Sequence, residues 1–129
     1  MSEFRTVEID IKEEDVLVQA LKQMGYNPVT HQQEIDLKTY YSDRVKPKAH
    51  IVVGKDQFNG YADAGFQRTS KGFNMHIDEM DQRKFKIGKL KQSYAEAKIM
   101  KTIKGTAKFT LRARQEEQGK VKLVLRRNF

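Results

Sequence analysis

Alternating apolar and polar residues predict strands at both ends of the chain. Val7, Ile9 and Ile11 alternate with polar residues, so we expect the first strand to span Phe4 to Ile11. The same alternation occupies residues 109–114 and 121–126, on either side of a turn at Glu116 to Gly119. These two segments therefore predict an antiparallel hairpin.

Two segments have helical rather than strand periodicity. The first follows the acids Glu13, Glu14 and Asp15, which suit a helix N-terminus, and it ends at Gly25. The second is predicted from Lys84 to Lys104, because apolar residues recur there every three or four positions.

Short apolar runs between the helices indicate further strands separated by glycines. The turn Thr69-Ser70-Lys71-Gly72 predicts a hairpin. The strands are expected at Val29 to His31, Ile51 to Val53, Tyr61 to Arg68 and Phe73 to Asp78. From Gln32 to Lys48 no period holds, and this segment, with Tyr40 and Tyr41, is predicted to be a long loop or a lid.

The order of these elements predicts an α+β fold. We expect two layers: a mainly antiparallel sheet of about six or seven strands, with two helices on one face. The 129 residues suit a single domain spanning 1–129.

Charge is strongly polarised along the chain. Residues 1–36 contain three Lys/Arg and eight acids, a net charge of −5, whereas residues 82–129 contain fifteen Lys/Arg and three acids, a net charge of +12. Such an excess on one segment favours a polyanionic partner: RNA, DNA or an acidic protein surface.

The terminal hairpin concentrates this charge on one predicted face. If its apolar residues pack inward, its cations share the outer face, where a phosphate backbone would relieve their repulsion. The candidate nucleic-acid contacts are Arg112, Arg114, Lys122, Arg126 and Arg127, extended by Lys91 and Lys98 if the second helix lies beside that face.

Three interpretations of this charge remain open. The leading hypothesis is a non-catalytic binding module that docks on RNA or a ribonucleoprotein. The alternative is an adaptor or assembly subunit that binds an acidic protein, which includes pairing between two copies of the chain. The plainer interpretation is that these charges are solvated and protect a sheet edge from aggregation.

Candidate catalytic and cofactor motifs are weak, and we assign no catalytic residue, metal or cofactor. A small metal-dependent enzyme would have to use His76 with Asp63 or Asp78, but three histidines without ligand spacing do not define a site. Lys71-Gly72-Phe73 begins like an RNA-recognition signature whose later positions are missing. The segment Gly60 to Gly65 has the glycine spacing of a phosphate loop, without its lysine.

The composition of the chain bears on where in the cell the protein is expected. The chain has no cysteine, which excludes disulfides and thiolate chemistry. Residues 1–10 have no apolar core of a secretory signal, and no apolar run approaches the roughly 18 residues of a membrane span. We therefore expect a protein of the cytoplasm or the plastid stroma.

Several segments, taken in order, resemble a family of small proteins of unknown function. They are Met1-Ser2-Glu3-Phe4, Ala20-Leu21-Lys22-Gln23-Met24-Gly25-Tyr26, Gly60-Tyr61-Ala62-Asp63-Ala64-Gly65-Phe66-Gln67-Arg68, Gln92-Ser93-Tyr94-Ala95 and Val121-Lys122-Leu123-Val124-Leu125-Arg126-Arg127-Asn128-Phe129. The resemblance implies relatives in cyanobacteria, in algal plastid genomes as a hypothetical chloroplast reading frame, in other bacteria and in phages.

The resemblance supports the order of elements and implies no activity, catalytic residue or cofactor. The chain departs from the family pattern after Phe73 to Asp78, where relatives often carry tryptophan and this chain has Glu79-Met80-Asp81. Whatever those tryptophans do is expected to be absent here.

Overall fold

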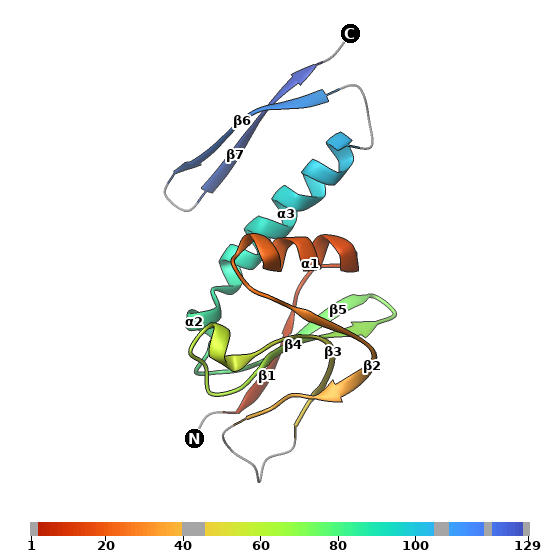
Figure 1. The fold of residues 1–129 in the computed structure, drawn as a ribbon, viewed down its shortest axis with the longest axis vertical. Helices are drawn as coiled ribbons and strands as arrows, with labels where there is room; N and C mark the ends of the chain where they lie inside the picture. Colours follow the sequence, from red (N-terminus) through yellow and green to blue (C-terminus); the bar gives the residue numbers. More distant parts are fainter. Residues whose placement is uncertain (1–2, 40–45, 105–108, 118–119, 128–129) are drawn as a thin grey trace.

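The computed structural model describes residues 3–39, 46–104, 109–117 and 120–127, and the last two stretches are described by their backbone alone. The architecture is α+β (Figure 1). Its elements, in order, are β1 (Phe4–Glu8), α1 (Glu14–Gln23), β2 (Val29–Asp36), β3 (Lys48–Val53), a 3-10 turn η1 (Lys55–Gln57), β4 (Ala64–Thr69), β5 (Gly72–Asp78), α2 (Gln82–Phe85), α3 (Ile87–Lys104), β6 (Phe109–Glu117) and β7 (Lys120–Arg127).

Five strands form one antiparallel sheet in the order β1-β5-β4-β3-β2. The β4–β5 hairpin is closed where Thr69 pairs with Gly72, as the turn residues predicted. β1 pairs with β5, so the N-terminal strand lies at one edge of the sheet and β2 at the other.

The expected sheet of six or seven strands is wrong, because β6 and β7 pair only with each other in a separate two-stranded sheet. The physical reason is the length of α3, whose 18 residues rise about 27 Å and carry the chain past the five-stranded sheet. The hairpin backbone lies beside the C-terminal part of α3, on the side of the helices away from the main sheet (Figure 1).

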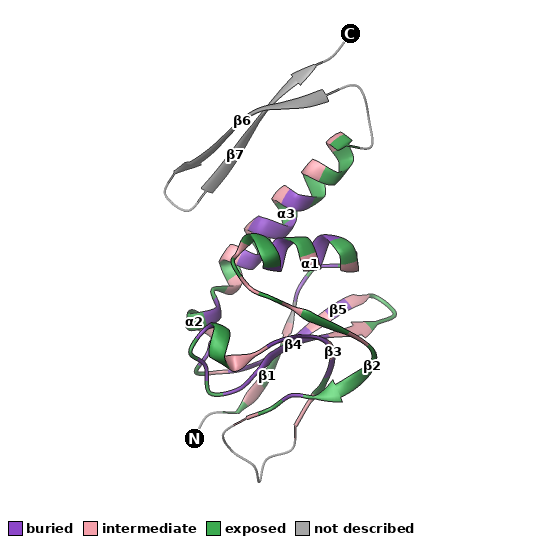
Figure 2. Cartoon of the chain, viewed as in Figure 1, coloured by how far each residue is buried: buried purple, intermediate pink, exposed green. Residues whose placement is uncertain are grey.

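Helices α1 and α3 pack over the same face of the five-stranded sheet, as expected. Alternate residues of β4 and β5, among them Phe66, Met75 and Ile77, join α1 and α3 in one apolar core. In α1 the buried residues are Val16, Leu17, Ala20 and Leu21, spaced at the helical period. Figure 2 shows this buried layer between the helices and the strands.

The predicted second helix is interrupted at Lys86. This residue adopts a left-handed conformation with φ 65°, which separates α2 from α3. The interruption places Phe85 in the core, where its ring stacks on Tyr26 with centroids 4.9 Å apart. Periodicity alone did not predict this break, because tertiary packing holds Lys86 in a conformation that residues other than glycine seldom adopt.

The segment predicted as a loop from Gln32 to Lys48 is partly strand. β2 continues to Asp36, Leu37 is fully buried, and Thr39 bridges to Ala62. The strand has no alternation because seven of its eight residues are exposed at the sheet edge. Tyr40 and Tyr41 lie outside the described residues.

Candidate nucleic-acid interface

The connection between β1 and α1, residues 9–13, is held from two sides. The Tyr94 hydroxyl of α3 accepts hydrogen bonds from the backbone amides of Lys12, at 3.3 Å, and Glu13, at 3.2 Å. The carbonyl of Ile11 accepts the backbone N–H of Phe73, at 2.9 Å. The connection is therefore a fixed ridge between α3 and the start of β5.

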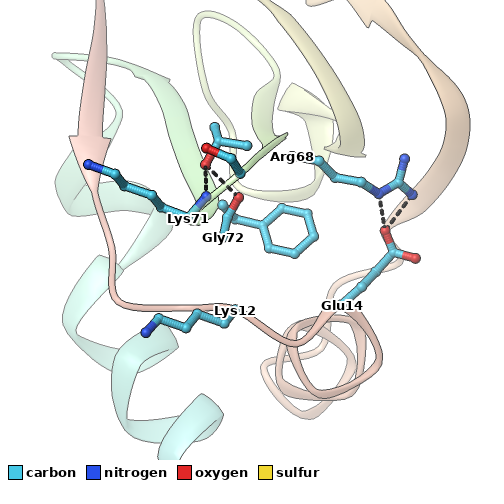
Figure 3. Close-up of a pocket in the computed structure, with 8 residues that line it drawn as sticks. Lys12, Glu14, Arg68, Lys71 and Gly72 are labelled. Atoms are coloured by element: carbon cyan, nitrogen blue, oxygen red, sulfur yellow. Dashed lines mark hydrogen bonds and ion pairs between the residues drawn. The ribbon is translucent and has the colours of Figure 1, made fainter.

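A pocket of about 420 Å³ lies on the β5 side of this ridge (Figure 3). Lys12 and Lys71 extend toward the same side of the pocket, and Arg68 with Glu14 lies on the other. Its lining residues are Lys12, Glu14, Arg68, Thr69, Ser70, Lys71, Gly72 and Phe73.

The β4–β5 turn holds Lys71 in place through Thr69. The Thr69 hydroxyl donates to the Gly72 carbonyl at 2.9 Å and accepts the Lys71 backbone N–H at 3.2 Å. Gly72 has φ +129°, and a Cβ there would meet the Ile11 carbonyl oxygen at 2.6 Å. Only glycine therefore allows the turn to approach the ridge this closely.

The Arg68 side chain forms its polar contacts within the protein. Its guanidinium forms an ion pair with Glu14 of α1 and donates to the carbonyl oxygens of His31, at 3.3 Å, and Gln32, at 3.4 Å. These contacts tie β4 both to α1 and, past β3, to β2, so the side chain's donors are used within the protein.

A second pocket, of about 460 Å³, lies on the α3 side of the ridge. Its lining residues are Asp10, Ile11, Lys91, Tyr94, Ala95 and Lys98. Asp10 and Ile11 immediately precede Lys12, which lines the first pocket, so the two pockets adjoin across the ridge.

Lys12, Lys71, Lys91 and Lys98, which we call the lysine surface, line these two pockets. Within the described part of the chain, none of their ammonium groups lies in an ion pair. Cations that surround concave pockets and pair with no described carboxylate form a positively charged surface that can bind anions.

Lys101, on α3 like Lys91 and Lys98, is ion-paired within the protein. Its ammonium lies 2.9 Å from Asp15 and 3.2 Å from Glu13. The hydrogen bond with Asp15 is the main cause that raises the pKa of Lys101, and the same bond lowers the pKa of Asp15. Lys101 therefore holds α1 to α3 rather than facing a ligand.

The structure brings together part of the predicted site. Lys91 and Lys98 share one pocket, as their positions on α3 allow. Lys12 and Lys71 were not among the predicted contacts, because Lys12 belongs to the acidic end and Lys71 was considered only as the start of an incomplete RNA-recognition signature. Only the closeness of the β4–β5 turn to the ridge reveals them.

The predicted hairpin contacts lie outside the part of the chain whose side chains are described. They are Arg112, Arg114, Lys122, Arg126 and Arg127. The backbone register places Arg114 opposite Leu123 and Lys122 opposite Gln115, with a register shift between Leu111 and Ala113. Since residues paired across two strands share a face and neighbours along a strand alternate, Arg114 and Lys122 lie on opposite faces of the hairpin, and the expected single face of cations is wrong.

His76 contacts neither of the acids proposed as its partners. Its Nδ1 lies 3.1 Å from the Thr6 hydroxyl, and its Nε2 lies 2.9 Å from the Gln67 side-chain oxygen. Asp63 instead accepts the backbone amides of Lys38, at 3.1 Å, and Lys55, at 2.9 Å.

Asp78 likewise accepts the backbone amide of Met80, at 2.9 Å. Among the described residues, no group of three His, Asp or Glu side chains is placed to hold a metal.

The glycine-rich segment from Gly60 to Gly65 binds an internal carboxylate. The backbone amides of Tyr61, at 2.9 Å, and Ala62, at 3.1 Å, donate to one oxygen of the buried Asp81. A Cβ on Gly60 would meet that oxygen at 2.9 Å and the ring of Phe58 at 2.2 Å. The glycine spacing that resembled a phosphate loop therefore serves to receive Asp81.

None of the helices described is both long and apolar enough to cross a membrane. Residues 20–124 match the model of a protein family described as "Protein of unknown function (DUF1257)". No curated protein matches the chain. No solved structure matches it either.

Proposed function

The chain belongs to the DUF1257 family, and we propose a function for it from its surface chemistry, because the description of that family names no activity. We propose that the protein is a non-catalytic module that binds single-stranded RNA. The observation that supports this proposal is the lysine surface, four ammonium groups around two adjoining pockets that form no ion pair with any described residue. When several lysines neutralise the phosphates of a nucleic acid, the counter-ions bound to those phosphates are released, and this release contributes affinity.

The shape of the surface favours single strands over duplexes. An unpaired base can turn into a concave pocket, whereas the bases of a duplex stay paired and stacked and cannot enter one. The lysines of this surface surround hollows of about 420 and 460 Å³. We propose that the strand crosses the ridge at residues 9–13 and continues along α3 toward the hairpin, whose five predicted cations supply further phosphate contacts.

A charge-matched pair of double variants tests the proposal. Lys91→Glu/Lys98→Glu reverses two charges of the lysine surface, and Lys22→Glu/Lys48→Glu reverses two exposed lysines that line neither pocket. Both variants lower the net charge from +8 to +4. Binding to a labelled RNA strand of about twelve nucleotides is followed by fluorescence anisotropy at about 50 and about 200 mM salt.

We expect the Lys91/Lys98 variant to bind about tenfold more weakly and the control variant to remain close to wild type. The slope of log affinity against log salt should fall by about 1.4 for the two lost phosphate contacts. Duplex RNA and duplex DNA of equal length should bind more weakly than the single strand. Equal losses in both variants, or no binding at the lower salt, would contradict the proposal and direct the search to an acidic protein partner.

A further inference from the structure

The pocket on the α3 side of the ridge is suited to a flat, apolar group. Its inner surface includes Ile11 and Tyr94, which are 2% and 6% exposed, together with Ala95. The Tyr94 ring cannot turn away without losing the two backbone donors held by its hydroxyl. The pocket therefore offers a rigid apolar floor of the kind on which a nucleobase packs.

Lys91 and Lys98 lie seven positions apart on α3, close to two full turns. Their Cα atoms are therefore on one side of the helix, separated by about 10 Å along its axis. Both residues line the pocket, and at this separation their side chains can reach the phosphates before and after a single inserted nucleotide.

Asp10 is an acidic residue that lines the same pocket as Lys91 and Lys98. Its exposed carboxylate forms no ion pair within the described residues, although two lysines line the same pocket. The acids that follow it, Glu13, Glu14 and Asp15, are each ion-paired with Lys101 or Arg68. A carboxylate repels phosphate, so its presence here favours a ligand that brings hydrogen-bond donors to this point.

We propose that this pocket holds a guanine base of single-stranded RNA, recognised by Asp10. On its Watson–Crick edge guanine presents two adjacent donors, N1–H and the N2 amino group, which match the two oxygens of one carboxylate. Cytosine and adenine present one amino donor beside a ring acceptor, and uracil places acceptors on both sides of its single donor. This inference rests on the proposed RNA binding and adds the identity of the base.

Four RNA strands of about nine nucleotides test the inference. Each is oligouridine with guanine, inosine, adenine or uracil at the centre, so that inosine differs from guanine only by the loss of the N2 amino group. Anisotropy with the wild-type protein should show about tenfold tighter binding of the guanine strand than of the uracil strand. The inosine strand should lie between them.

Asp10→Asn is the informative variant, because one carboxylate oxygen is replaced by an amide nitrogen that cannot accept. Asp36→Asn, on exposed β2, makes the same change of charge outside both pockets. The quantity compared is the ratio of guanine to uracil affinity within each protein, so the added positive charge cancels. The ratio should fall to about one in Asp10→Asn and stay near the wild-type value in Asp36→Asn.

The outcomes separate this inference from the proposed function. If all four strands bind wild type equally, or if Asp10→Asn retains the guanine preference, the guanine pocket is wrong and RNA binding stands. If no strand binds at low salt, both fail. If Asp10→Asn does not fold, as judged by its thermal unfolding, the inosine strand still decides the matter with the unaltered protein.

Discussion

His76 lies in a row of hydrogen-bonded side chains from four of the five strands, on the sheet face away from the helices. The row runs from Thr6 through His76 and Gln67 to Glu34, which accepts the Gln67 amide at 2.9 Å. Since the Gln67 nitrogen donates to Glu34, its oxygen accepts from His76 Nε2–H. Burial disfavours the charged ring, and in the neutral ring Nδ1 accepts from the Thr6 hydroxyl.

The row predicts how stability depends on pH. Burial lowers the pKa of His76 below its ordinary value of 6.5, because it disfavours the charged ring. As the pH falls below about 6.5, the unfolded chain takes up this proton before the folded chain does, so the free energy of unfolding decreases until the lowered pKa is passed.

Thermal unfolding between about pH 8 and about pH 5 measures this effect. His76→Gln, which does not titrate, should lose less stability on acidification than wild type. His31→Gln, a histidine outside the row, should follow the wild-type curve. Identical curves for all three proteins would show that His76 does not contribute.

At the level of the elements, β4 can contact the segment after β2 only because Gly65 has no side chain. A Cβ on Gly65 would meet Ala49 Cβ at 2.5 Å and Leu37 Cδ2 at 2.7 Å. Leu37 and Ala49 are fully buried, so neither neighbour has solvent to move into. Gly65 thus lets the end of β2 close over the sheet face.

Gly65→Ala should lower the free energy of unfolding by roughly 1–3 kcal/mol through overpacking. Gly88→Ala is the matched control, because a Cβ there meets nothing within 4 Å and lies in α3, where alanine is favoured by up to about 1 kcal/mol. The urea unfolding midpoints of both variants are compared with that of the wild type, and we expect only Gly65→Ala to lower the midpoint. Tolerance of Gly65→Ala would mean that Leu37 repacks freely.

Considered as a whole, the molecule carries much of its net charge beyond the described apolar core. The described core residues extend no further along the chain than Ala97. Residues 105–129 carry seven Lys/Arg and two Glu, a net charge of +5 out of the total of +8. The five-stranded sheet and its helices should therefore fold without the hairpin.

A chain that ends at Lys104 tests this separation. We expect it to unfold cooperatively in urea, because the five-stranded sheet and the described core are complete without β6 and β7. Its RNA binding should be weaker and less dependent on salt, since the cations of the hairpin are gone. Loss of cooperative unfolding would show that the hairpin completes the core, and unchanged binding would place the RNA elsewhere.

Local patterns predicted most of the elements. The alternation around Val7 and the helical spacing from Val16 to Leu21 depend on one buried face, and such a face is visible within a few residues. The family resemblance is confirmed as membership, whereas the distribution of relatives among cyanobacteria and plastids stays a prediction. The continuation of edge strand β2 from Gln32 to Asp36 and the break at Lys86 were missed, because neither is determined by a local apolar period.

The candidate site divides in the same way. Net charge and its polarity are properties of composition, so a polyanionic partner can be inferred before any fold is known. Which lysines share a surface depends on hydrogen bonds between distant segments: Tyr94 to the ridge and Ile11 to Phe73. Lys12 and Lys98 are 86 positions apart and line adjoining pockets only because these contacts fold the chain back on itself.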